Sequence, residues 1–164
     1  MVKIETLIDE GKLSRINELE LDRYVNFFSS SYKNNLDHCK FVLGSFPRWS
    51  IISGYYAMHD ITKLLLAKQF RLKVDFEVHA TTIKVLSSLV KNKEIVLLIK
   101  RGYDEFISLA NDLAEAKKER VKVQYYTGTK FLEEEYKRRS ADFLDEVVNP
   151  YLKKMSVLLR GLEE

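Results

Sequence analysis

The fold is decided by the stretch Arg48-Trp49-Ser50-Ile51-Ile52-Ser53-Gly54-Tyr55-Tyr56-Ala57-Met58-His59, which leads into an apolar run ending in Leu64-Leu65-Leu66. The stretch is crowded with aromatic residues and carries no charge between Arg48 and Asp60. A helix on the surface of a globular protein has one polar face, and this pattern leaves none. It therefore predicts the central helix of a small all-α domain, buried on most sides.

A long amphipathic helix is predicted before this stretch. Apolar residues recur at three- and four-residue steps over residues 17–46, and Asn17 followed by Glu20 is typical of a capping box at a helix start. Pro47 is expected to end this helix, and proline also suits the first turn of the next helix, over residues 48–70.

Three further helices are predicted after the central one. The third covers residues 75–91, with Asp75 as its N-cap, and the fourth extends from about residue 95 into the region 120–126. A turn at 127–129 separates it from the fifth helix. Pro150 falls inside the apolar pattern of that fifth helix, so we expect a kink or a short interruption there.

These elements predict an up-and-down helical bundle of about five helices, because the connections between them are short. Residues 17–164 are assigned to this single domain, and residues 1–16, with a break at Gly11, to an N-terminal extension. No segment alternates strongly enough to predict a strand. Gly102 inside the fourth helix costs about 1 kcal/mol relative to alanine, so we expect a close helix contact or a bend there.

Composition places the chain among ordinary folded domains. Hydrophobic residues make up 46% of the chain and charged residues 31%. The net charge of +3 is compatible with a local basic patch but does not by itself indicate a nucleic-acid-binding protein. The single cysteine, Cys39, excludes an intrachain disulfide and suits a reducing compartment. No apolar run long enough to span a membrane and no signal-peptide pattern is present, so the expected location is the cytoplasm.

Three histidines are present: His38, His59 and His79. None has a cysteine or another histidine at a zinc-finger spacing, and no glycine-rich phosphate loop occurs, so neither a metal nor a cofactor is expected. His59 and His79 both lie on apolar helix faces. Each is either a hydrogen-bonded core residue or a member of a functional site.

A basic and aromatic segment ends the fourth predicted helix. The apolar stripe of that helix reaches Arg120, and Lys117, Lys122, Tyr125 and Tyr126 lie around it. Cations interleaved with aromatic rings can hold phosphates while stacking bases, so these five residues are candidates for nucleotide or RNA binding. The alternative is an arginine that simply exits into solvent at a helix end.

Three features together resemble the HEPN domain family. The helix with Ser53-Gly54-Tyr55-Tyr56-Ala57-Met58-His59 resembles the signature helix of that family, His79 follows after a short loop, and residues 117–126 resemble the stretch in which an arginine precedes a tyrosine. They occur in the order of the family, and the similarity covers roughly residues 17–160.

The resemblance implies a helical bundle that commonly forms a twofold dimer. Many members are ribonucleases, often toxins or defence effectors, in which an arginine is followed by a histidine with four to six residues between them. Other members lack that pair and accompany a small nucleotidyltransferase.

This chain departs from the ribonuclease pattern at the decisive position. The residues separated from Arg120 by four, five and six others are Tyr125, Tyr126 and Thr127, and none is a histidine. Metal-free RNA cleavage needs groups that accept and donate protons near neutral pH, which an imidazole does and a phenol with a pKa near 10 does not.

Three hypotheses follow. The first is a non-catalytic or weakly active HEPN homodimer of a prokaryotic toxin–antitoxin or defence-type system, which binds nucleotide, RNA or a partner through the Arg120 region and dimerises beside Tyr125 or Tyr126. The second is a metal-independent endoribonuclease with a rearranged site, in which His59 or His79 is the catalytic histidine. The third is a structural subunit that holds a nucleotidyltransferase or an antitoxin.

Overall fold

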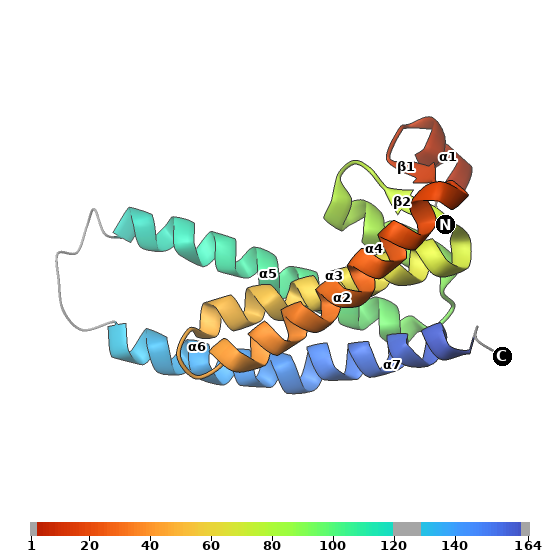
Figure 1. Cartoon of the computed structure of the whole chain (residues 1–164). Helices are drawn as coiled ribbons and strands as arrows, with labels where there is room; N and C mark the ends of the chain where they lie inside the picture. Colours follow the sequence, from red (N-terminus) through yellow and green to blue (C-terminus); the bar gives the residue numbers. More distant parts are fainter. Residues whose placement is uncertain (1–2, 120–128, 162–164) are drawn as a thin grey trace.

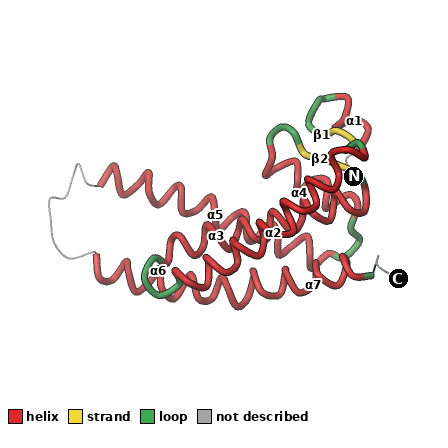
Figure 2. The backbone as a smooth tube through the Cα atoms, viewed as in Figure 1, coloured by secondary structure: helices red, strands yellow, loops and turns green. Residues whose placement is uncertain are grey.

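The computed structural model describes residues 3–119 and 129–161 and confirms an all-α helical bundle (Figure 1). In chain order its elements are α1 (Ile4–Asp9), β1 (Leu13–Arg15), α2 (Glu18–Val42), α3 (Pro47–Phe70), β2 (Leu72–Val74), α4 (Val78–Leu89), α5 (Lys93–Glu119), α6 (Thr129–Phe143), the π-helical turn η1 (Leu144–Val148) and α7 (Asn149–Arg160). The long helix α3 runs antiparallel to α2 and α5, and α6 to α7 run back along α5 (Figures 1 and 2).

The helix α3 occupies the centre, as its sequence predicts. It packs against α2, α4, α5, α6 and α7, and most of its residues are buried. Its fully buried apolar side chains include Ile51, Ala57, Met58, Ile61 and Leu65. Within the described ranges, no helix is both long and apolar enough to cross a membrane.

The predicted starts of the two longest N-terminal helices are confirmed. The Asn17 side chain accepts a hydrogen bond from the backbone N–H of Glu20 at 2.9 Å, which caps the helix, and its amide also donates to the Glu20 carboxylate at 3.0 Å. Pro47 lies in the first turn of α3, where its missing N–H costs nothing. The helix α2 ends at Val42, four residues earlier than its apolar pattern predicts.

The prediction that the chain contains no strand is wrong. β1 and β2 pair antiparallel, with Leu13 opposite Val74 and Arg15 opposite Leu72. Strands of three residues are too short to show an alternating pattern in the sequence. The apolar side chains of this strand pair form a second small core with α1, α3 and α4, made of Leu7, Leu13, Leu66, Leu72, Val74 and Val85.

The predicted start of α4 at Asp75 is also wrong. The backbone N–H of Asp75 donates to the Lys12 carbonyl at 3.0 Å, which continues the strand pairing past the position where the helix was expected to begin. The N-cap is Glu77, in the left-handed backbone region with a φ of 47°, and α4 begins at Val78. The strand pairing therefore delays the helix by about three residues.

The predicted interruption near Pro150 is confirmed and takes the form of a π-helical turn. η1 covers Leu144–Val148, directly before α7, and Pro150 occupies the first turn of α7. Proline cannot donate a backbone hydrogen bond, so the wider turn before it removes the need for a regular α-helical bond at that point.

Two helical glycines mark where helices approach closely. A Cβ added at Gly54 would lie 3.0 Å from Val148 and 3.2 Å from both Cys39 and Phe143. A Cβ at Gly102 would lie 3.0 Å from the flexible end of Met58, which confirms the predicted close contact. The difference is that Gly54 is enclosed by side chains from two directions, whereas one adaptable side chain faces Gly102.

We predict that Gly54→Ala lowers the free energy of unfolding by about 1–2 kcal/mol, because overpacking outweighs the ~1 kcal/mol gained in helix propensity. Gly102→Ala is the matched control and is expected to leave stability unchanged or slightly raised, since the Met58 end can move. Urea unfolding followed by circular dichroism measures both. A larger loss at Gly102 than at Gly54 would contradict this account of the core.

Candidate functional site

Only part of the predicted site falls within the described residues. Arg120, Lys122, Tyr125 and Tyr126 lie outside them. Lys117 belongs to α5, but its side chain also lies outside the described part of the chain. His59 and His79 are described, and the fold brings these two together.

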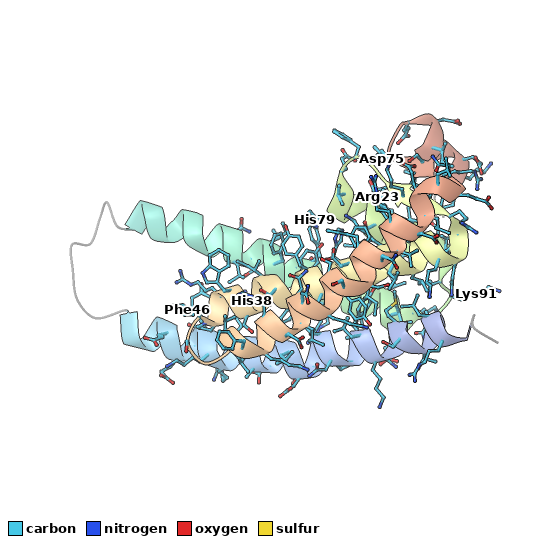
Figure 3. The ribbon with its side chains drawn as sticks, viewed as in Figure 1. Arg23, His38, Phe46, Asp75, His79 and Lys91 are labelled. Atoms are coloured by element: carbon cyan, nitrogen blue, oxygen red, sulfur yellow. The ribbon has the colours of Figure 1, made fainter. Side chains whose placement is uncertain are left out.

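The two histidines come from different helices and meet beside the bundle core. His59 lies in α3 and His79 in the first turn of α4, with their ring centroids 4.9 Å apart. Figure 3 labels His79. The side chain of His59 is 2% exposed, and its Nε2 has no hydrogen-bond partner. His79 is only half-buried. His59 therefore lies sealed in the interior, and His79 is the member of the pair that a ligand can reach.

A buried phenol fixes the orientation of His79. The hydroxyl of Tyr55 lies 2.8 Å from Nδ1 of His79, and Tyr55 has no exposed surface. Burial raises the pKa of Tyr55 well above its usual value of 10, so the phenol stays protonated. We assign the His79 proton to Nε2, because the protonated phenol then donates to Nδ1. The imidazole thus has one nitrogen anchored and one left for other contacts.

Aromatic rings from α5 complete the cluster. Phe106 stacks on Tyr55 with a centroid distance of 4.7 Å, and Tyr103 lies nearly parallel to His79 at 5.9 Å. Neither Phe106 nor Tyr103 is among the candidate residues predicted from the sequence. The position of Tyr103, four residues after the buried Ile99 and three before Phe106, would have placed it on the same face.

Both histidines are held in the neutral form. Burial lowers the pKa of His59, and the Asp60 carboxylate, 3.9 Å from Nδ1 of His59, opposes that shift only in part. Burial also lowers the pKa of His79, and the neighbouring His59 and Lys63 lower it further. A neutral imidazole accepts a proton readily at pH 7, which a protonated one does not.

The carboxylate of Asp60, beside the two histidines, is hydrogen-bonded to α2. Asp60 accepts hydrogen bonds from the Ser31 hydroxyl at 2.6 Å and the Asn35 amide at 3.0 Å. These bonds satisfy a buried charge and fix α2 against α3 at the level of the histidines. Asp60 is thereby occupied with structural contacts.

A shallow surface pocket opens at His79. It is lined by Glu77, Val78, His79, Ala80, Lys84 and Tyr103, at the start of α4 and the facing side of α5. Glu77 is engaged in an ion pair with Lys12 at 3.2 Å. Lys84 remains as the cation of this pocket, beside a neutral imidazole and a phenol. These groups suit a ligand with a ring and one anionic group.

The α5 helix separates this pocket from the basic segment. Glu119, the last residue of α5, follows Tyr103 by 16 positions, which is about 24 Å at 1.5 Å per residue. Arg120 is the next residue in the chain. A small ligand bound at His79 therefore cannot touch the Cα position that ends α5.

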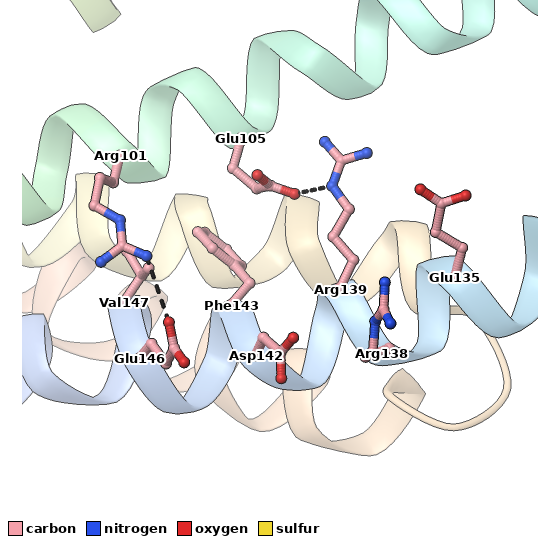
Figure 4. Close-up of a pocket in the computed structure, with 9 residues that line it drawn as sticks. All are labelled: Arg101, Glu105, Glu135, Arg138, Arg139, Asp142, Phe143, Glu146 and Val147. Atoms are coloured by element: carbon pink, nitrogen blue, oxygen red, sulfur yellow. Dashed lines mark hydrogen bonds and ion pairs between the residues drawn. The ribbon is translucent and has the colours of Figure 1, made fainter.

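The deeper pocket between α5 and α6 has a different character (Figure 4). Arg139 pairs with Glu105 and donates to the Ser108 hydroxyl at 2.7 Å. Arg101 lies 3.5 Å from Glu146. Acidic residues thus neutralise its arginines, which makes this pocket a poor site for phosphate.

Comparison of the chain with family models, with curated proteins and with solved structures finds no match. The assignment of function therefore depends on the sequence resemblance and on the geometry of the histidine cluster.

We predict that stability falls as the pH drops below about 6.5. Both histidines have lowered pKa values in the folded chain, so the unfolded chain takes up more protons in this range. Each one contributes a slope of at most about 1.4 kcal/mol per pH unit. Urea unfolding between pH 7.5 and 5.5 measures the slope.

His59→Gln should flatten this pH dependence, whatever it does to absolute stability. His38→Gln, which changes a histidine outside the cluster, is the control for the substitution itself. Equal slopes for the His59 variant and wild type would refute the assignment of His59 as a buried neutral imidazole.

Proposed function

We propose that this protein is a HEPN-type homodimer that binds RNA or a nucleotide and belongs to a prokaryotic toxin–antitoxin or defence-type system. The resemblance of residues 53–59 and 117–126 to that family, together with the helical bundle, supports the proposal. The observation that carries the binding role is the His79 pocket, where an anchored neutral imidazole lies beside Tyr103 and Lys84.

In this proposal the pocket takes one nucleotide unit of a longer ligand. The Nε2–H of His79 donates to a base or sugar oxygen, and the Lys84 ammonium contacts a phosphate. The basic segment 117–126 contacts phosphates further along the strand. A single strand of several nucleotides is therefore a better ligand than a free nucleotide.

The alternative is a metal-independent endoribonuclease, favoured by the same oriented imidazole. An imidazole anchored by a buried phenol is arranged as a general base. Cleavage also needs a proton donor at the leaving oxygen, and His59, being sealed behind His79, does not reach a substrate. Within the described residues the pocket supplies one imidazole, which supports binding with weak or no cleavage.

We predict that single-stranded RNA binds with an affinity that falls steeply between 50 and 200 mM salt. Lys84→Ala and Arg120→Ala should each weaken binding several-fold and reduce the slope of log K against log salt by about 0.7, the value for one lost phosphate contact. Fluorescence anisotropy of a labelled 12-nucleotide RNA measures both. Lys153→Ala, an exposed lysine on α7, is the matched control.

The nuclease alternative is tested on the same preparations. The assay is cleavage of a mixed RNA pool in the presence of EDTA. A drop in cleavage of at least tenfold on His79→Ala would establish a ribonuclease, and an inactive wild type would rule out the nuclease alternative. Absence of RNA binding at 50 mM salt would defeat the binding proposal. A structural subunit for a nucleotidyltransferase or antitoxin would then remain.

A further inference from the structure

The outer face of α2 lacks a covering element. Among the described elements α2 packs mainly on α3, and it buries only Phe28, Cys39 and Val42. The opposite face carries large apolar side chains in solvent: Leu19 is 96% exposed, Phe41 85% and Phe27 62%. A helix 25 residues long with such side chains facing water is typical of an interaction surface.

The exposed residues of α2 follow the spacing of a helix–helix seam. Steps of three and four residues connect positions on one outward stripe: Leu19, Arg23, Asn26, Ser30, Lys33, Asp37 and Phe41. All of these are exposed. This spacing is the one with which two helices pack side by side. The outer face of α2 is therefore shaped for another helix.

The chemistry of this stripe is self-complementary about Ser30. Residues at equal distances before and after Ser30, on the same side of the helix as Ser30, form matched pairs, which are Leu19 with Phe41, Arg23 with Asp37, and Asn26 with Asn34. The first pair is apolar, the second joins opposite charges, and the third joins two amides. No pair sets like charges against each other.

This complementarity is not used within one chain. Arg23 and Asp37 are 14 residues apart, about 21 Å along the helix, and Leu19 and Phe41 about 33 Å. Within the described part of the chain neither Arg23 nor Asp37 forms an ion pair. Figure 3 shows Arg23 and His38 on separate parts of α2. The matching groups meet only in an antiparallel arrangement of two copies.

We propose that the outer face of α2 binds the same face of a second copy, antiparallel, with the twofold axis at Ser30. In an isologous interface each contact occurs twice, so the pairing of Leu19 with Phe41 covers both ends and Arg23 with Asp37 lies on both sides of the axis. The small side chain of Ser30 lets the backbones approach at the crossing point. This names the surface of the homodimer in the proposed function and does not depend on RNA binding.

Charge reversal tests the pairing. Arg23→Glu sets a carboxylate opposite Asp37 of the other copy at two positions, and Asp37→Arg sets two guanidinium groups together, so each single variant should weaken dimerisation at least tenfold. The double variant R23E/D37R restores opposite charges and should restore the dimer. Sedimentation velocity on the full chain, whose monomer mass is 19.2 kDa, distinguishes the two states.

Disulfide trapping tests the register of the pair. Ser30→Cys should form a covalent dimer on mild oxidation, because the two positions face each other on the axis. Asn34→Cys should not, because positions 34 and 34 of the two copies lie about 12 Å apart along the helix, beyond the ~7 Å limit for a disulfide. A mixture of Asn26→Cys and Asn34→Cys should cross-link. The native Cys39 is buried.

The outcomes separate the proposals. A wild-type monomer at high micromolar concentration overturns the interface, as does a dimer that Arg23→Glu leaves intact and Ser30→Cys fails to trap. In the latter case the contact lies elsewhere, for example beside Tyr125 or Tyr126. Circular dichroism confirms that each variant is folded. If a charge-reversed monomer still binds RNA, the RNA-binding proposal is supported independently of the proposed interface.

Discussion

The structure depends on the burial of α3 on nearly all sides. A helix without a solvent face must be covered by several neighbours, and here α2, α4, α5, α6 and α7 cover it. Its polar groups then require partners inside the protein. The Thr62 hydroxyl bonds to Tyr151 at 2.6 Å, Asp60 accepts bonds from α2, and Tyr55 bonds to His79. The hydrogen bond between Tyr55 and His79 in the histidine cluster is thus one of several that satisfy buried polar groups of α3.

The sequence predicts those features that depend on neighbouring residues or on a long apolar run. The apolar run 48–66 identified α3, and Asn17 and Pro47 gave the helix starts because caps act on adjacent residues. Sequence reasoning failed for β1 and β2, whose pairing joins residues about 60 positions apart through strands of three residues. The misplaced start of α4 at Asp75 is a consequence of the same pairing. Long-range hydrogen bonds therefore overrode a good local capping signal.

The candidate site was predictable in its members and not in its arrangement. His59 and His79 were both flagged from their apolar faces, but their contact depends on how α4 docks on α3. Tyr55 was read as a core residue, and only its distance to Nδ1 of His79 shows that it orients an imidazole. The palindromic pattern of α2 was present in the sequence throughout. It acquires meaning only once the structure shows which face of the helix is uncovered.

The π-helical turn η1 determines which face of α7 packs against the core. Buried residues from Tyr136 to Leu159 span 23 positions, and a regular helix would rotate by about 140° off the starting face over that length. One added residue per turn at η1 takes up about 100° of this drift, so both halves keep facing α3. Loss of a single residue between 144 and 148 would convert η1 into a regular α-helical turn and leave Tyr151 facing Thr62, because the wider turn holds one extra residue without rotating the helix that follows. A deletion elsewhere in α6 or α7 would rotate the following residues by about 100°. The protein is therefore more tolerant of a deletion in this turn than of one in the helices on either side.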